Sequence, residues 1–137
     1  MTDYPSTLLS QMRPDDQVVS YLPLKKIQSG CMGTKEVNYG FVAITNQRLI
    51  AQGIKYDNED LKAKKQTIHD ETVNVPLTKV SSMSVFHMET PKGGCLGGKI
   101  HAYTLNLNVQ GGTYSFYVGT DNRAANEFVR TFLDITE

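Results

Sequence analysis

The chain lacks an excess of charge of either sign. Its 137 residues include 14 lysines and arginines and 14 aspartates and glutamates, for a formal net charge of +0 at neutral pH. A balanced chain has no overall field of the kind that draws a protein to nucleic acid or to an acidic membrane. We therefore expect no nucleic-acid partner, and any electrostatic function must come from a local group of residues.

Cysteines and long apolar runs are also scarce. The two cysteines, Cys31 and Cys95, lie far apart and belong to no C-x-x-C pair, so we expect free thiols. Residues 1–10 lack the basic-then-apolar profile of a signal peptide, and no stretch approaches the roughly 20 apolar residues of a membrane-spanning helix. These absences predict a soluble, cytoplasmic protein.

The most informative stretch that is present predicts a hairpin. Two apolar runs flank the polar segment Thr45–Arg48. A two-residue turn at the centre of this segment would place Ile44 opposite Leu49 and Val42 opposite Ala51. The pairing register would then be fixed by apolar partners on one face of the sheet.

This hairpin and the downstream segment Val75–Met83 carry a family resemblance. Together they resemble the "T-N-x-R-L-I" plus "I-P-L-x-x-I-x-x-I" pattern of the pleckstrin-homology (PH) superfold, specifically its bacterial PH-like and GRAM-like families. The resemblance implies a mainly β (α+β) fold, a bent antiparallel barrel of about seven strands capped by one C-terminal α-helix. It also implies that four residues serve turns and strand pairing rather than catalysis: Thr45, Asn46, Arg48 and Pro76.

The length of the chain suits one domain that buries its own core. We divide it into an N-terminal arm with a short helix, residues 1–16, and a PH-like domain, residues 17–137. Local patterns then predict a helix at Leu8–Met12, a strand at Gln17–Lys26 that Pro23 marks as an edge, and a glycine-bearing loop at Ile27–Lys35. Further strands are expected at Thr67–Val75 and Ser81–Glu89.

A second hairpin and a terminal helix complete the expected fold. Gly111-Gly112 predicts a two-residue turn because glycine tolerates positive φ angles, and this turn would place Gln110 opposite Thr113 and Leu107 opposite Phe116. Asp121 is expected to cap a helix from Asn122 to about Ile135. The apolar stripe of this helix, which must bury against a sheet, consists of Ala125, Phe128, Val129 and Phe132.

Lysines supply the candidate anion-binding surface. Phosphoinositide-binding PH domains carry a basic pattern whose first half Lys25 and Lys26 resemble, but Glu36–Tyr39 supplies no arginine for the second half. The chain also has no tryptophan, which eukaryotic PH domains typically carry in the final helix. Loops at one end of such a fold would bring six lysines toward an anionic bilayer: Lys25, Lys26, Lys35, Lys62, Lys64 and Lys65. Nearby acids would cancel much of that field, so we favour a solvated, mixed-charge loop.

Two histidines form a second candidate site. A strand connection symmetric about Gly94 would place His87 opposite His101 and Glu89 opposite Lys99, so that two imidazoles meet at the barrel mouth. With Glu89 or Cys95, they could hold zinc or act as a proton switch.

No pattern in the sequence points to catalysis. The serines of Ser81–Ser84 lie in an expected strand rather than a G-x-S-x-G elbow, and no two carboxylates stand out as an acid/base pair. We therefore expect no enzyme, no cofactor and no small-molecule substrate. The leading hypothesis is an interaction module that binds a protein partner or assembles with itself. The alternatives are a peripheral adaptor for anionic lipid and a metal- or pH-responsive sensor.

Overall fold

The computed structural model describes residues 4–30, 33–55, 69–91 and 99–136. After the short helix α1 (Ser6–Leu9), the first four strands are β1 (Val18–Gly30), β2 (Gly33–Thr45), β3 (Arg48–Lys55) and β4 (His69–Pro76). A single 3-10 turn, η1 (Leu77–Lys79), leads into β5 (Val80–Pro91), β6 (Lys99–Val109) and β7 (Gly112–Gly119), and the chain ends in helix α3 (Arg123–Thr136).

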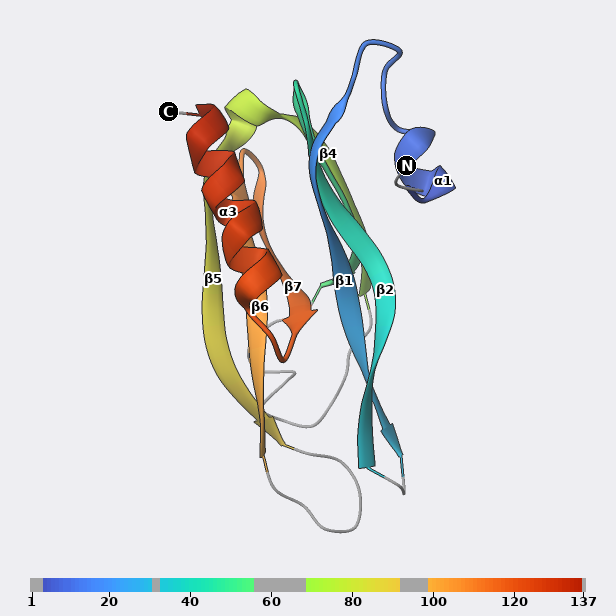
Figure 1. The fold of residues 1–137 in the computed structure, drawn as a ribbon, viewed down its shortest axis with the longest axis vertical. Coiled ribbons are helices and arrows are strands. Elements are labelled where there is room, and N and C mark those ends of the chain that lie inside the picture. Colours follow the sequence, from blue (N-terminus) through green and yellow to red (C-terminus); the bar gives the residue numbers. More distant parts are fainter. Residues whose placement is uncertain (1–3, 31–32, 56–68, 92–98, 137) are drawn as a thin grey trace.

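The strands form two antiparallel sheets, one of four strands (β1–β4) and one of three (β5–β7). Among the described residues, one pair of strand partners, Lys55 and Phe116, joins the two sheets. Helix α3 contacts both β5 and β1 and lies across the opening between the sheets (Figure 1). Within the described residues, the predictions of a mainly β chain with seven strands and one C-terminal helix are confirmed.

The predicted bent barrel is not closed in the part of the chain that the structure describes. Strands β1 and β5 lie at the two ends of the strand order and do not pair with each other in this part of the chain. The physical reason is that α3 packs between these two strands and takes the place that direct pairing would occupy. The described architecture is therefore two facing sheets with a helix over their open side.

The main core lies between the two sheets and α3. The first hairpin is confirmed as predicted, with Ile44 paired to Leu49 and Val42 to Ala51. Apolar side chains from β2, β3, β6 and α3 meet in one buried cluster. The helix contributes buried Ala125, Phe128 and Phe132 and the partly buried Val129. Asp121 Oδ1 accepts the backbone N–H of Arg123 at 2.9 Å, as expected of a cap.

A second, smaller core attaches the N-terminal arm. Leu8 of α1 is fully buried against Phe41, Ala43 and Ile50, which lie on the outer face of the first sheet. Ala43 and Ile50 are direct cross-strand partners, so the hairpin has one face in each core. The arm helix was predicted at Leu8–Met12, and α1 lies a few residues earlier, at Ser6–Leu9.

Two sequence predictions about turns are wrong. Residues 27–35 were expected to form a loop, but the β1–β2 ladder continues to the pair Gly30 and Gly33, because backbone pairing outweighs the low strand propensity of glycine. At the other hairpin, Val109 pairs with Gly112, so Gln110 and Gly111 form the turn and Gln110 does not face Thr113. The Gln110 N–H is held by the Lys79 carbonyl at 2.9 Å, and Gly111 takes φ 104°.

The register error leaves the faces of the sheet unchanged. Leu107 pairs with Tyr114 rather than Phe116, a shift of two residues. Because side chains alternate with a period of two, the same residues still point into the core.

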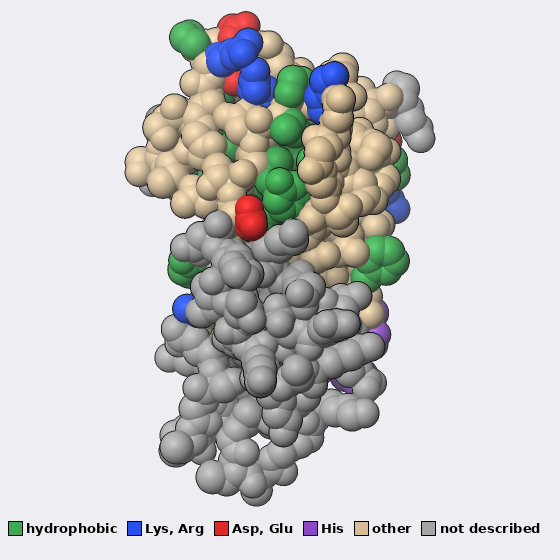
Figure 2. Space-filling view, turned by 180° about the vertical axis from the view of Figure 1, so that it is seen from behind, with side chains coloured by type: hydrophobic (Ala, Val, Ile, Leu, Met, Phe, Trp, Pro, Cys, Tyr) green, Lys and Arg blue, Asp and Glu red, His purple; other side chains and the backbone are tan. Residues whose placement is uncertain are grey.

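Figure 2 shows the face of the molecule opposite α3, where hydrophobic side chains gather in a strip along the upper half.

Candidate functional site

The Thr45–Arg48 turn is held by side chains. Thr45 is fully buried, and its Oγ1 accepts the backbone N–H groups of Gln47 at 3.1 Å and Arg48 at 2.8 Å. Asn46 reaches across to the N-terminal arm, where its Oδ1 accepts the N–H of Gln17 at 2.9 Å and its Nδ2 donates to the Asp15 carbonyl at 3.3 Å. The turn thus ties the arm to the sheet.

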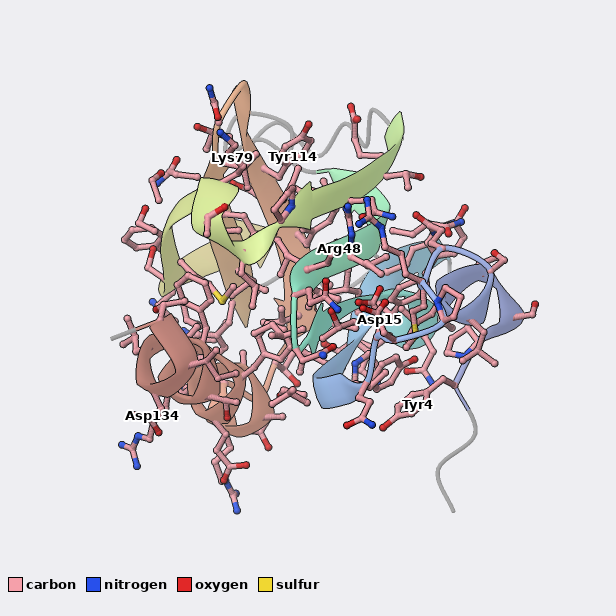
Figure 3. All side chains as sticks on the ribbon, turned by 90° about the horizontal axis from the view of Figure 1, so that it is seen from above. Tyr4, Asp15, Arg48, Lys79, Tyr114 and Asp134 are labelled. Atoms are coloured by element: carbon pink, nitrogen blue, oxygen red, sulfur yellow. The ribbon has the colours of Figure 1, made fainter. Side chains whose placement is uncertain are left out.

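Arg48 contacts the neighbouring strand. Its Nη1 donates to Asn74 Oδ1 at 2.9 Å, and Pro76 is its backbone partner on β4. Next to it, Gln47 Nε2 donates to Asp15 Oδ2 at 2.9 Å, and this hydrogen bond holds the pKa of the Asp15 carboxyl below its ordinary value. Figure 3 looks onto this end of the molecule and labels Asp15 and Arg48, with Asp134 of α3 on the far side. The side chains of Gln47 and Arg48 thus connect the turn to the N-terminal arm and to β4.

The lysines of the proposed anionic-lipid surface are described only in part. Lys25 Nζ donates to Asn38 Oδ1, and Lys26 Nζ lies 5.3 Å from the centroid of the Tyr39 ring. Both ammonium groups therefore have partners within the β1–β2 ladder. The side chain of Lys35, and all of Lys62, Lys64 and Lys65, lie outside the described residues. The lipid-binding hypothesis stays a prediction for all six lysines.

A contact that the sequence did not reveal joins the two sheets. Tyr117 of β7 is buried, and its hydroxyl donates to Glu36 Oε1 of β2 at 2.7 Å. Gly119 follows on the same strand at φ 118°, and a Cβ placed there would lie 3.3 Å from the Glu36 carboxylate. The two residues of the hydrogen bond are 81 positions apart, and no local pattern signals such a pair.

The structure brings His87 and His101 together, but by a different register from the one predicted. His87 is paired with Tyr103, and Glu89 with His101, so the direct pairing of the two histidines and that of Glu89 with Lys99 are wrong. The histidines are diagonal neighbours on one face, where His87 Nε2 and His101 Nδ1 are 2.9 Å apart. Glu89 lies in β5, but its side chain falls outside the described residues, as does Cys95.

A small cavity lies where α1 meets the first sheet. It has a volume of about 290 Å³ and is lined by Pro5, Thr7, Tyr39, Gly40, Phe41, Gln52 and Gly53. This lining has no carboxylate, imidazole or thiol to act as an acid, a base or a nucleophile.

The edge of β5 is the most unusual surface in the described part of the chain. Native sheets protect an edge strand with proline, charge or bulges. β1 follows this rule, because it carries Pro23, Lys25 and Lys26 and two register shifts. β4 carries Asp70 and Glu71 and ends at Pro76. β5 has such features only at its ends, a register shift between Val80 and Ser82 and then Glu89 and Pro91. Between them, Ser82–Phe86 carries no proline and no charge, and Phe86 is 54% exposed.

No known relative indicates a function for the sites described above. Comparisons with protein-family profiles, curated proteins and solved structures found no match to this chain. Within the described residues, no group of three or more His, Cys, Asp or Glu side chains is arranged to hold a metal ion. In the same part of the chain, no helix has the length and apolar character needed to cross a membrane.

Proposed function

We propose that the chain is a non-catalytic interaction module of PH-like type that assembles with a second copy of itself through the free edge of β5. The observation that carries the proposal is the uncharged, proline-free stretch Ser82–Phe86 at the centre of this edge strand, with Phe86 exposed beside it. The order of seven antiparallel strands followed by one helix across the open side supports the PH-like assignment. The residue pattern at Thr45–Arg48 and Pro76 agrees with it.

The β5 edge suits pairing because its backbone groups on one side have no neighbouring strand among the described residues. An exposed edge of this kind is a template for another strand. Figure 1 shows that β5 continues below the first turn of α3, so the helix leaves its C-terminal half uncovered. The exposed Phe86 lies in that half and adds apolar surface beside the edge.

A second copy is the occupant that the composition favours. A two-fold interface uses the same surface on both subunits, so each charge on it faces its own copy or a close neighbour. The stretch from Val80 to Phe86 carries no charge and meets no repulsion when it pairs antiparallel with itself. The formal net charge of +0 also removes long-range repulsion between copies.

Sedimentation velocity across a wide range of protein concentrations tests this proposal. We expect the native chain to form a dimer whose population rises with concentration. The dimer of Phe86→Lys should have a dissociation constant about tenfold or more higher, because the variant places two like charges at the interface. The matched control is Val19→Lys, which changes a 48% exposed apolar residue on the protected edge strand β1 and should leave the dimer intact. A native chain that stays monomeric throughout, or a Phe86→Lys variant that dimerises normally, would contradict the proposal.

A further inference from the structure

The imidazoles of His87 and His101 meet on the inner face of the second sheet, beyond the end of the core. Along this face of β5 and β6, Met83 and Leu105 belong to the main core cluster, and Val85 and Tyr103 pack against it. His87 and His101 follow in the same alternation and are both exposed. The purple histidine side chains are visible at the edge of the molecule in Figure 2.

The two rings approach each other edge to edge. Their centroids are 5.1 Å apart and their planes differ by 24°, while His87 Nε2 and His101 Nδ1 are separated by only 2.9 Å. The facing nitrogens therefore lie near the line that joins the centroids. In the hydrogen bond between them, one nitrogen donates and the other accepts. When neither nitrogen carries a proton, the pair offers two lone pairs to the same small volume.

The spacing of these nitrogens is that of a hydrogen bond, and it is also close to the spacing of two ligands on one metal ion. Bonds of about 2.0–2.1 Å from a metal ion to imidazole nitrogen place adjacent ligands about 2.9 Å apart at a right angle, and about 3.3 Å apart at the tetrahedral angle. Small turns of the two rings, which are 2.9 Å apart at Nε2 and Nδ1, would therefore replace the hydrogen bond by two bonds to one ion.

The surroundings hold the pair in place before any ion binds. The ring of Tyr103 lies 5.3 Å from that of His87, centroid to centroid, at an interplanar angle of 59°. Tyr103 itself packs against the main core, and both histidines project from paired strands rather than from loops. Ligands on regular elements with packed neighbours lose little conformational freedom on binding.

We propose that His87 and His101 bind a divalent transition-metal ion as two adjacent ligands, in place of the hydrogen bond between them. Imidazole suits Ni²⁺, Cu²⁺ and Zn²⁺. Since the described residues offer no third protein ligand beside the pair, water or an external ligand completes the coordination. His87 belongs to β5, the strand of the proposed dimer, but its side chain lies on the inner face of the sheet and contacts His101 of the same chain, so the site is complete within one chain.

Isothermal titration calorimetry with Ni²⁺ tests the site in the full chain. The chain has three histidines, which provides a matched control. We expect one Ni²⁺ per chain in the native protein, unchanged binding in His69→Ala, and about tenfold or more weaker binding in His87→Ala and in His101→Ala, because each leaves one imidazole without its chelate partner. Thermal unfolding should shift upward with Ni²⁺ only where both residues are present, since a ligand of the folded state stabilises it.

Each other result has a defined meaning. Ni²⁺ binding that survives in His87→Ala and His101→Ala, or that is absent from the native chain, would overturn the proposal. His87→Gln and His101→Gln repeat the test with a polar side chain of similar size. Circular dichroism of every variant separates loss of the ligand from loss of the fold.

Discussion

At the Thr45–Arg48 turn, side chains supply hydrogen bonds that the backbone alone does not make. Thr45 Oγ1 accepts two backbone N–H groups at a position without solvent exposure, where an amide left unpaired costs about 1–3 kcal/mol. Threonine and asparagine favour such turns, which is why the hairpin could be predicted from the sequence. The partners of Arg48 and Asn46 could not, because they lie 26 and 29 positions away along the chain.

Glycine at position 40 provides the clearest prediction for a single residue. Gly40 has φ +92°, and a Cβ added there would lie 2.1 Å from the Gln52 carbonyl oxygen. We therefore expect Gly40→Ala to lower the free energy of unfolding by about 2 kcal/mol or more, through positive-φ strain and displacement of β3. Urea denaturation measures this change.

The control for Gly40 is Gly112, on β7. A Cβ there would meet the Tyr114 ring at 3.6 Å, which is ordinary van der Waals contact. Gly112→Ala should change the free energy of unfolding by no more than about 0.5 kcal/mol. Equal losses in the two variants would show that the position of Gly40 carries no special constraint.

For the strands, the sequence predicts which residues lie on the same face of the sheet more reliably than it predicts which residues pair across neighbouring strands. Both β5–β6 and β6–β7 differ from the predicted register by two residues, and both keep their core-facing side chains. Hydrophobic alternation cannot distinguish registers that differ by two, because they bury the same residues. The distinguishing contact, from the Gln110 N–H to the Lys79 carbonyl, joins two separate elements and leaves no local signal. His87 and His101 still meet because diagonal neighbours lie within reach of an imidazole.

Helix α1 provides a prediction about how the N-terminal arm is attached. It has four residues, too few to be stable alone, so its order depends on burial of Leu8 beneath the outer face of the first sheet. Leu8→Ala should lower the free energy of unfolding by about 2–5 kcal/mol, through lost burial and a new cavity. Leu9→Ala is the matched control, since Leu9 is 54% exposed. If chemical denaturation gave the same stability for both variants, the arm would not belong to the cooperative fold.

At the scale of the whole molecule, the sequence predicted the order of elements but not how the two sheets meet. Seven strands and a final helix follow from local patterns, whereas the contact between the sheets depends on pairs such as Lys55 with Phe116 and Glu36 with Tyr117. These pairs connect residues that are far apart in the chain and involve polar groups without periodicity. The free edge of β5 is a property of the assembled strand order and could not be recognised before that order was known.

Charge balance over the whole molecule leads to the prediction for membranes. With a net charge of +0, attraction to an anionic bilayer must come from a local group of lysines. Lys25 and Lys26 already contact Asn38 and Tyr39, so the main candidates are Lys62, Lys64 and Lys65. Each lysine near such a surface contributes about 1 kcal/mol, and acids close by in the sequence offset that attraction. We expect no flotation with either anionic or neutral vesicles at physiological salt.

Two variants test this expectation. One is a triple variant that combines Lys62→Ala, Lys64→Ala and Lys65→Ala, and its control is a double variant that combines Lys25→Ala and Lys26→Ala. Flotation with anionic vesicles that weakens with salt and disappears in the triple variant alone would contradict the expectation, because three lost contacts of about 1 kcal/mol lower affinity by about a hundredfold. The membrane adaptor would then replace the self-assembling module as the account of this fold. Flotation lost only in the double variant would instead assign lipid binding to the β1–β2 ladder, with Lys25 and Lys26 exchanging Asn38 and Tyr39 for lipid phosphate.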